Sequence, residues 1–392
     1  MKLPEIPVDL LKYNLPAHRI AVRPMPKRDH SKLLSFRNDR IEDFQFFNLP
    51  EILPTGTLII ANNTRVIPAR LIFQKETGTF VEIFLLESLN SDWSQWSAMV
   101  GNRKKFRETE SLAISDPEGN QLQVSWLDRN ANTIQFSSKS GLSFQELIFS
   151  CGAVPLPPYI KRETDESDKK NYQTVFAEKS GAVAAPTASL HFTEDVLTNL
   201  QKKGVKSSFI TLHVGAGTFI PVTTDLVSDH TMHAETFELS LTTLQTIIRQ
   251  IENKKSIVAV GTTSMRLLES IYYIGLNLIK NVPNPFYIES DVAFREIVQP
   301  VDTLTSLKHL EKHLLLNNQE CSGKTAIFIL PGFPFRVCDG LVTNFHQPGS
   351  TLIGLVYAFI GEKWQKVYRH ALENQYRFLS YGDSSILWRD QT

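Results

Sequence analysis

Between residues 56 and 137 the sequence consists of short β-branched and aromatic runs separated by polar breaks, with no stretch of helical periodicity. Runs of this length and composition are typical of β-strands. So many strands in so short a segment predict a small barrel or sandwich that forms a domain of its own. A proline-rich joint at 154–158 follows, and we therefore place an all-β, barrel-like domain at residues 56–150.

The pattern changes after about residue 180, where predicted strands alternate with predicted helices. Buried-strand runs occur at 257–261, 325–330, 340–344 and 384–388. Helical segments are expected at 241–251, from Thr262 to about 273, from Ser350 to 359, and over 363–375. Such alternation indicates a layered α/β domain, to which the N-terminal residues return after the β insertion.

The fold class predicted for the chain is therefore α/β, a layered main domain with an inserted all-β barrel-like domain. The main domain comprises residues 1–55 and 151–392, and 56–150 is the insertion. Residues 275–322 are expected to be a further insert, a surface excursion with no assigned function.

Composition and charge narrow the class of protein. Of the 392 residues, 42% are hydrophobic, and no apolar run approaches the ~20 residues that span a bilayer. The N-terminus lacks the apolar region of a secretory signal. Three scattered cysteines without metal-type pairing favour a reducing cytoplasm. We expect a cytoplasmic monomer with no membrane partner.

Lysine and arginine balance aspartate and glutamate at 41 each, so any nucleic-acid site must be a local patch. The strongest candidate is Arg103, Lys104, Lys105 and Arg107. Two further clusters, one around Lys27 and one at 161–162, are weaker candidates. A solvated surface is the alternative for each.

A glycine loop follows the apolar run ITLHV. Gly215 and Gly217 would let a ligand approach the backbone closely, with Thr218 beside them. The loop continues into a β-branched, proline-stopped segment. A dinucleotide or methyltransferase loop would instead continue into a helix.

Two predicted strand-to-helix turns add polar groups to this candidate ligand site. Thr262, Thr263 and Arg266 lie at the first turn, and Asn344 and His346 at the second. Ligands of open α/β sheets bind outside the carboxyl ends of the strands. Backbone N–H groups together with an arginine suit a carboxylate or a phosphate.

The segment HTMHAE allows two kinds of chemistry. His230, His233 and Glu235 could be zinc ligands of a hydrolase, or His233 and Glu235 could act in metal-free acid–base catalysis. Their spacing favours the metal-free hypothesis, because positions 233 and 235 of a strand share one side. We expect Glu235→Gln to reduce turnover with little effect on stability.

The motifs occur in a characteristic order. They are LPAHRIAVRPMPKRDHSKLL (15–34), NNTRVIPARL (62–71), VPLPPYIKR (154–162), NYQTVFA (171–177), VAAPTASLHFT (183–193), HVGAGTFIPV (213–222), MHAE (232–235), VAVGTTSMRLLES (258–270), FILPGFPFRVCDGLVTNFHQPGSTLI (328–353) and YRFLSYGDSSIL (376–387). With these segments the chain resembles the S-adenosylmethionine:tRNA ribosyltransferase-isomerases of queuosine biosynthesis, along nearly its whole length.

This resemblance implies a reaction. The ribosyl part of S-adenosylmethionine is transferred to 7-aminomethyl-7-deazaguanine in a tRNA with a queuosine-type anticodon and isomerised, giving epoxyqueuosine with release of adenine and methionine. The sulfonium supplies the electrophile, so S-adenosylmethionine is a co-substrate and neither a metal nor a prosthetic group is needed. The expected acid–base groups are Glu235, His233, His213, His346 and Asp383.

The chain departs from the family pattern at several positions, including Ala182, Ser189 and Gly349, with Asn63 and Phe333 as further examples. These departures keep two alternatives open. One is a diverged RNA-binding paralogue with weak or no turnover. The other is a different S-adenosylmethionine-dependent transferase, such as a methyltransferase.

Overall fold

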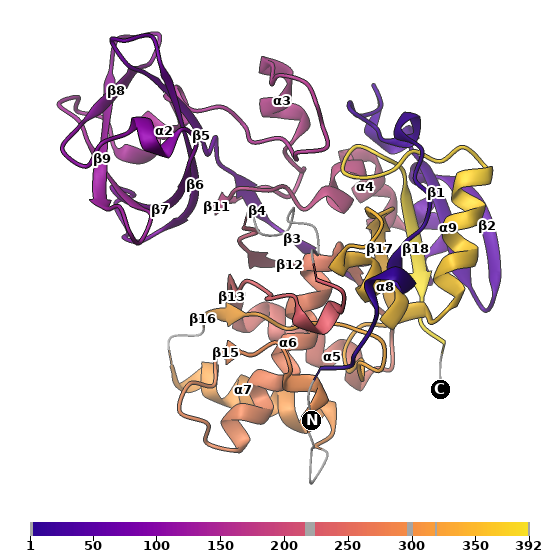
Figure 1. Ribbon diagram of the computed structural model, residues 1–392. Helices are drawn as coiled ribbons and strands as arrows, with labels where there is room; N and C mark the ends of the chain where they lie inside the picture. The colour runs from indigo at the N-terminus through magenta and orange to yellow at the C-terminus, as the bar shows by residue number, and fades with distance from the viewer. Residues whose placement is uncertain (1–2, 216–223, 296–300, 318–319, 391–392) are drawn as a thin grey trace.

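The computed structural model describes residues 3–215, 224–295, 301–317 and 320–390 (Figure 1). Two bodies are visible, an α/β body and, to one side of it, a smaller β unit. Gly217 and Thr218 of the glycine loop lie outside the described residues. None of the helices described is long and apolar enough to cross a membrane.

A ten-stranded mixed sheet forms the centre of the α/β body. Its order is β15(Tyr287–Ile288), β16(Glu320–Thr325), β13(Glu235–Ser240), β12(Lys206–Leu212), β3(Leu58–Asn62), β14(Ile257–Val260), β17(Gly340–Asn344), β18(Ser384–Trp388), β1(Lys32–Arg37) and β2(Arg40–Gln45). β12, β3, β14 and β17 run parallel, so their carboxyl ends open on the same edge.

Alternating side chains of the central strands are buried in two different cores. In β3, Leu58 and Ile60 pack into the larger core, whereas Ile59 and Ala61 pack into the other. This is the period-two alternation of a strand covered on both faces. The helices follow the same division. The larger core contains residues of α5(Leu241–Glu252), α6(Thr262–Ile279), α7(Thr303–Leu316), α8(Thr351–Ile360) and α9(Lys363–Glu373), and the other contains residues of α1(Leu49–Ile52) and α4(Glu194–Lys202).

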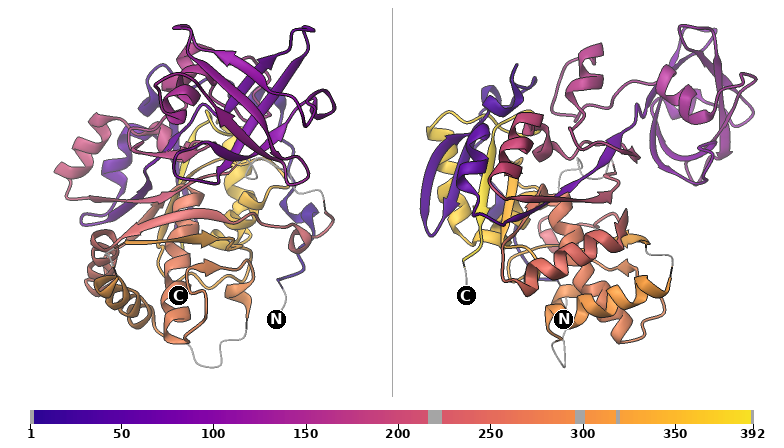
Figure 2. Two further views of the ribbon diagram at one scale, coloured as in Figure 1. Left: turned by 90° about the vertical axis from the view of Figure 1, so that its left-hand side faces the viewer. Right: turned by 180° about the vertical axis from the view of Figure 1, so that it is seen from behind.

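The β unit is a six-stranded antiparallel sheet. Its order is β5(Arg70–Gln74), β6(Phe80–Ser88), β7(Gln95–Val100), β10(Thr133–Ser137), β9(Gln121–Asp128) and β8(Leu112–Ser115), with Leu147 and Ile148 of α2(Phe144–Cys151) in its core. The order ends at β5 and β8, so a closed barrel is not confirmed. A short parallel pair, β4(Thr64–Val66) and β11(Lys179–Ala182), lies where the unit meets the body (Figures 1 and 2).

The structure corrects three sequence-based expectations about the fold. The run at 56–62 was expected in the β unit, but as β3 it lies inside the ten-stranded sheet. The run at 325–330 was expected to be a strand, whereas the strand there is Glu320–Thr325. The segment 275–322 is no surface excursion, because Leu307 and Leu310 are fully buried in the larger core. The domain boundaries themselves remain predictions.

Candidate functional site

Two adjoining pockets lie near the edge of the sheet at which β14 and β17 end. The inner pocket is lined by the start of α6, by residues 343–350 and by residues 184–188. The outer pocket, with a volume of about 590 Å³, lies between the α/β body and the β unit. Val214 and Leu352 line both pockets, so the two spaces adjoin.

Glu235 and Arg266 form a buried ion pair in the wall of the outer pocket. The guanidinium Nη1 of Arg266 donates to the Oε2 carboxylate oxygen of Glu235. Arg266 Nε also donates to the backbone carbonyl of Ile327, at 3.3 Å. The side chains are only 9% and 6% exposed. Arg266 therefore lines the outer pocket rather than the inner pocket of Thr262 and Thr263, contrary to the expectation that the three form one anion site.

His213 lies in the same pocket and has a tightly packed environment. Its Nδ1 is 2.9 Å from Thr64 Oγ1, and its Nε2 is 4.0 Å from Glu238 Oε1. Burial lowers the pKa of His213, although Glu238 opposes this shift. The imidazole is thus neutral at pH 7 and can accept a proton. Gly181 makes this position possible, because a Cβ there would lie 2.8 Å from the imidazole ring.

His230 and His233 also line the outer pocket, together with Glu235 and Gly215. Strand β13 begins only at Glu235, so His233 lies before the strand, and the argument that positions 233 and 235 share one side of a strand does not apply. Burial lowers the pKa of His230, and neighbouring His233 adds to the shift. Within the described residues, no group of three or more His, Cys, Asp or Glu side chains could hold a metal ion.

The inner pocket contains the N-terminus of α6. Gly261 precedes the helix with φ 88°, and Thr262 and Thr263 follow it at the pocket wall. The Oγ1 atom of Thr263 is buried and has no hydrogen-bond partner among the described residues. A buried hydroxyl without a partner is costly, and a helix N-terminus favours negative groups. Both features suit a polar or anionic ligand group at this position.

Asn344 and His346 line the inner pocket as expected, but His191 was missed by the sequence analysis. His191 Nδ1 is 2.8 Å from Ser31 Oγ, and its Nε2 is 3.2 Å from Asn344 Nδ2. Thr187 Oγ1 donates to Asn344 Oδ1 at 3.2 Å. This network orients the Asn344 amide. In the sequence, this hydrogen-bond network is indicated only by the presence of Thr187 and His191 within the motif VAAPTASLHFT.

The imidazole of His346 is also held by hydrogen bonds, with Nε2 2.8 Å from Thr343 Oγ1. Burial lowers the pKa of both His191 and His346 to about 3. Both side chains are therefore neutral at physiological pH. His346 can therefore donate or accept a hydrogen bond in the pocket without carrying charge, and His191 can do so toward Asn344.

Asp383 is not among the residues lining either pocket. Its carboxylate accepts the backbone N–H of Lys32 at 3.0 Å and that of Arg377 at 2.7 Å. The side chain is 3% exposed. These bonds tie β1 to the segment before β18, so Asp383 has an anchoring position in the fold, and its expected catalytic role stays a prediction.

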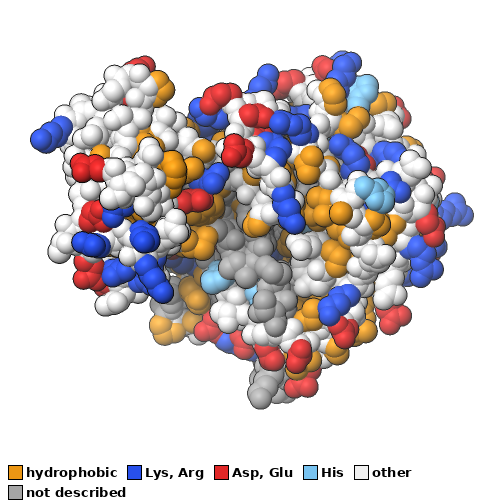
Figure 3. Space-filling model, turned by 45° about the horizontal axis from the view of Figure 1, so that its top comes forward, with side chains coloured by type: hydrophobic (Ala, Val, Ile, Leu, Met, Phe, Trp, Pro, Cys, Tyr) orange, Lys and Arg blue, Asp and Glu red, His pale blue; other side chains and the backbone are white. Residues whose placement is uncertain are grey.

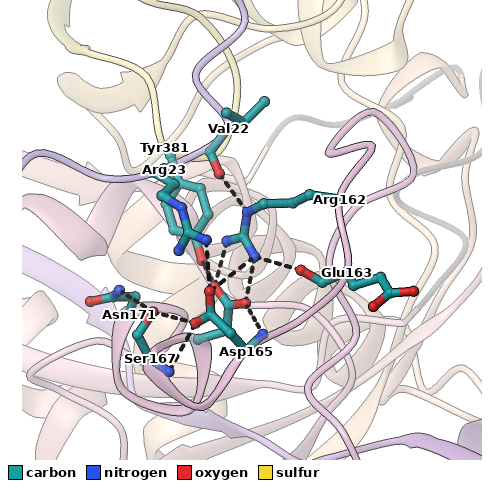
Figure 4. Close-up of polar contacts among 9 residues, drawn as sticks. Val22, Arg23, Arg162, Glu163, Asp165, Ser167, Asn171 and Tyr381 are labelled. Carbon is teal, nitrogen blue, oxygen red and sulfur yellow. Dashed lines mark hydrogen bonds and ion pairs between the residues drawn. The ribbon is translucent and has the colours of Figure 1, made fainter.

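Arg162, in one of the weaker basic clusters, is bound within the protein (Figure 4). It donates to both carboxylate oxygens of Asp168, at 2.7 and 2.6 Å, and to the carbonyl of Val22 at 3.1 Å. Tyr381 also donates to Asp168, at 3.4 Å. Arg28 of the other weak cluster similarly donates to two backbone carbonyls. Neither guanidinium is an open cation.

Arg103, Lys104, Lys105 and Arg107 are exposed on the β unit. Figure 3 shows Lys and Arg side chains gathered on this lobe. Arg103 lies over the ring of Trp126 and donates to the carbonyl of Arg129. The patch is therefore open to solvent, and its RNA-binding role stays a prediction.

The α/β body has a pocket beyond parallel strand ends, and the β unit supplies one wall of a second pocket. Together they define a two-lobed protein with two adjoining pockets as its candidate site. The family model of queuosine biosynthesis proteins matches residues 8–387. The chain belongs to this family.

Individual relatives share this family assignment. The chain is 39% identical to an S-adenosylmethionine:tRNA ribosyltransferase-isomerase of Zymomonas mobilis, over 97% of this chain and 98% of that protein. It is also 39% identical to the enzyme of that name from Brucella anthropi, over 97% of both chains. A solved S-adenosylmethionine tRNA ribosyltransferase from Thermotoga maritima is 28% identical and covers 96% of this chain and 99% of its own, with a TM-score of 0.48.

Proposed function

We propose that this protein is an S-adenosylmethionine:tRNA ribosyltransferase-isomerase. It transfers the ribosyl moiety of S-adenosylmethionine to 7-aminomethyl-7-deazaguanine in tRNA, isomerises it to epoxyqueuosine, and releases adenine and methionine. The near full-length identity to enzymes of that name supports this function. The observation that supports it most is that the two pockets adjoin at Val214, so that the pocket at the N-terminus of α6 meets the pocket lined by His213, His233 and Glu235.

S-adenosylmethionine spans this junction in our proposal. Its carboxylate lies at the N-terminus of α6, beside the Thr263 hydroxyl, which has no hydrogen-bond partner among the described residues. Its ribose lies near Gly215, in the outer pocket. The Glu235 carboxylate, fixed by Arg266, faces the sulfonium and offsets its positive charge.

His213 is the proposed base that removes the proton beside the sulfonium, because its imidazole is unprotonated and lines the outer pocket. His233 is the proposed proton carrier for the attacking amine and the departing adenine. His346 and Asn344 hold the ligand by hydrogen bonds in the inner pocket. No step requires a metal ion.

The test is incubation with S-adenosylmethionine and tRNA that carries the precursor base, followed by chromatography of the released base and the digested nucleosides. Adenine and epoxyqueuosine should form together, with or without a chelator. Replacing the substrate by tRNA that lacks the precursor should abolish both products. Normal tRNA binding without adenine release would instead identify an idle RNA-binding paralogue.

Asp383→Asn provides a matched comparison with His213→Gln. Loss of the anchoring carboxylate should lower stability by about 2 kcal/mol, because hydrogen bonds to a charged group are lost. The protein that remains folded should still release adenine. His213→Gln should stay folded and lose turnover by about a hundredfold or more. Normal turnover in His213→Gln together with lost turnover in folded Asp383→Asn would instead support a catalytic role for Asp383.

A further inference from the structure

Trp93 has an unusual backbone conformation in the wall of the outer pocket. It lies between β6 and β7 of the β unit and has φ 65°, in the left-handed region. Bulky residues rarely adopt this conformation, which is strained and persists only where the surroundings enforce it. Such strain is concentrated at ligand sites and therefore calls for a functional explanation.

A network of short-range contacts enforces the position of Trp93. The indole Nε1–H of Trp96 donates to the carbonyl of Trp93 at 2.7 Å. Asp92 accepts the N–H of Ser94 at 3.0 Å, and Asn90 donates to the Ser94 hydroxyl at 2.8 Å. The rings of Trp93 and Trp96 meet edge to face, with centroids 5.3 Å apart. The buried Trp96 is thus a rigid support.

The two tryptophans and Met99 form an apolar wall of the outer pocket. Trp93 is half-buried, whereas Met99 is 51% exposed. The opposite wall, on the α/β body, contains His213, His233 and the Glu235–Arg266 pair. Aromatic side chains of the β unit and groups of the α/β body suited to proton transfer therefore line the same pocket.

We propose that Trp93, supported by Trp96, is a stacking platform for the RNA nucleobase that the opposite wall modifies. This inference rests on the proposed function. An enzyme that modifies a base must take it out of the stack, and aromatic side chains commonly receive the extruded base. The pocket volume of about 590 Å³ lies in the range of small-molecule sites. The β unit thereby becomes part of the substrate site.

Trp93→Gly is the most informative variant, because glycine removes the ring and tolerates the positive φ. Trp93→Asn is a second variant, since asparagine also tolerates this conformation. Trp93→Phe keeps an aromatic face. Phe80→Ala is the control, as Phe80 is 54% exposed on β6 and does not line the outer pocket.

The measurement is the Kd for an anticodon stem-loop RNA carrying the precursor base and for the same RNA with an abasic site there. The wild-type protein and Phe80→Ala should bind the base-containing RNA about tenfold tighter or more. Trp93→Gly and Trp93→Asn should lose this difference, and Trp93→Phe should retain most of it. The Kd for S-adenosylmethionine alone should not change.

A base preference that survives in folded Trp93→Gly or Trp93→Asn would overturn the platform, and so would its absence from the wild-type protein. The platform would also be overturned if Trp93→Gly weakened S-adenosylmethionine binding and left the base preference unchanged, since the Trp93 ring would then contact the adenine of S-adenosylmethionine. Binding is measured without turnover. A preserved preference in a protein that releases no adenine would refute the proposed function and leave the platform intact.

Discussion

The guanidinium of Arg266 and the carboxylate of Glu235 form a buried ion pair that joins α6 to the first residue of β13 in the wall of the outer pocket. The ion pair links α6 and β13 next to the proposed reaction centre. Substitution of Glu235 would leave the positive charge of Arg266 buried without this carboxylate.

Glu235→Gln should therefore reduce both stability and turnover. Leaving Arg266 buried without its counterion costs on the order of 3 kcal/mol, which corrects the expectation of unchanged stability. Turnover should fall by about a hundredfold or more. Denaturant unfolding and adenine release measure the two effects. The double variant Glu235→Gln/Arg266→Met should regain stability but not turnover. Near-normal turnover in folded Glu235→Gln would exclude a role for this carboxylate.

Gly181→Ala should displace the imidazole of His213. The added Cβ would lie 2.8 Å from the ring, too close for van der Waals contact. A misplaced base costs about tenfold to a hundredfold in turnover, so kcat should fall while the Kd for tRNA is retained. Gly141→Ala is the control, because its added Cβ would meet no described atom within 4 Å. Equal kcat in both variants would contradict the role of His213.

The two neutral histidines of the inner-pocket network should make stability depend on pH. Their folded pKa of about 3 lies below the ordinary 6.5, so the unfolded chain binds protons between these values that the folded chain does not. The free energy of unfolding should therefore fall as the pH decreases from about 6.5 toward about 3. His346→Gln should reduce this slope by about 1.4 kcal/mol per pH unit. Denaturant unfolding at pH 5 and pH 6 tests the slope, and an unchanged value would contradict the assignment.

The exposed patch on the β unit should contribute electrostatically to tRNA binding. Lys104→Glu/Lys105→Glu should weaken binding and reduce the dependence of log K on log salt by about two. The affinity for S-adenosylmethionine should remain the same. Lys202→Glu/Lys203→Glu is a matched control, since these exposed lysines lie at the end of α4 on the body. Equal effects of both double variants would place the RNA footprint elsewhere.

The elements that the sequence predicted well are those determined by neighbouring residues. The strand at 257–260, and α8 with its Ser350 cap, follow from local periodicity and capping. β3 was assigned to the wrong sheet because a short apolar run is compatible with a strand of either sheet. Its partner strands, β12 and β14, lie far from it in the sequence. Polar residues were expected at the turns that follow the runs 257–261 and 340–344. These turns lie close together because β14 and β17 are parallel neighbours.

The side-chain contacts within the candidate site could not be predicted from neighbouring residues in the sequence. Arg266 and Glu235 lie 31 positions apart in the sequence, and His191 and Asn344 lie 153 positions apart, so no local pattern indicates either contact. Nothing in the local sequence indicates the φ of 65° at Trp93. The partners of Asp383, two backbone N–H groups and the guanidinium of Arg377, were likewise not apparent from the sequence.

The central claim is that the protein transfers the ribosyl group of S-adenosylmethionine, and not its methyl group, to tRNA, and differentially labelled S-adenosylmethionine tests it most directly. One sample carries the label in the ribose and another in the methyl group, and each is incubated with precursor-containing tRNA. The account predicts label in tRNA from the ribose alone, in equal amount to the adenine released. Label transferred from the methyl group without adenine release would identify a methyltransferase and contradict the account.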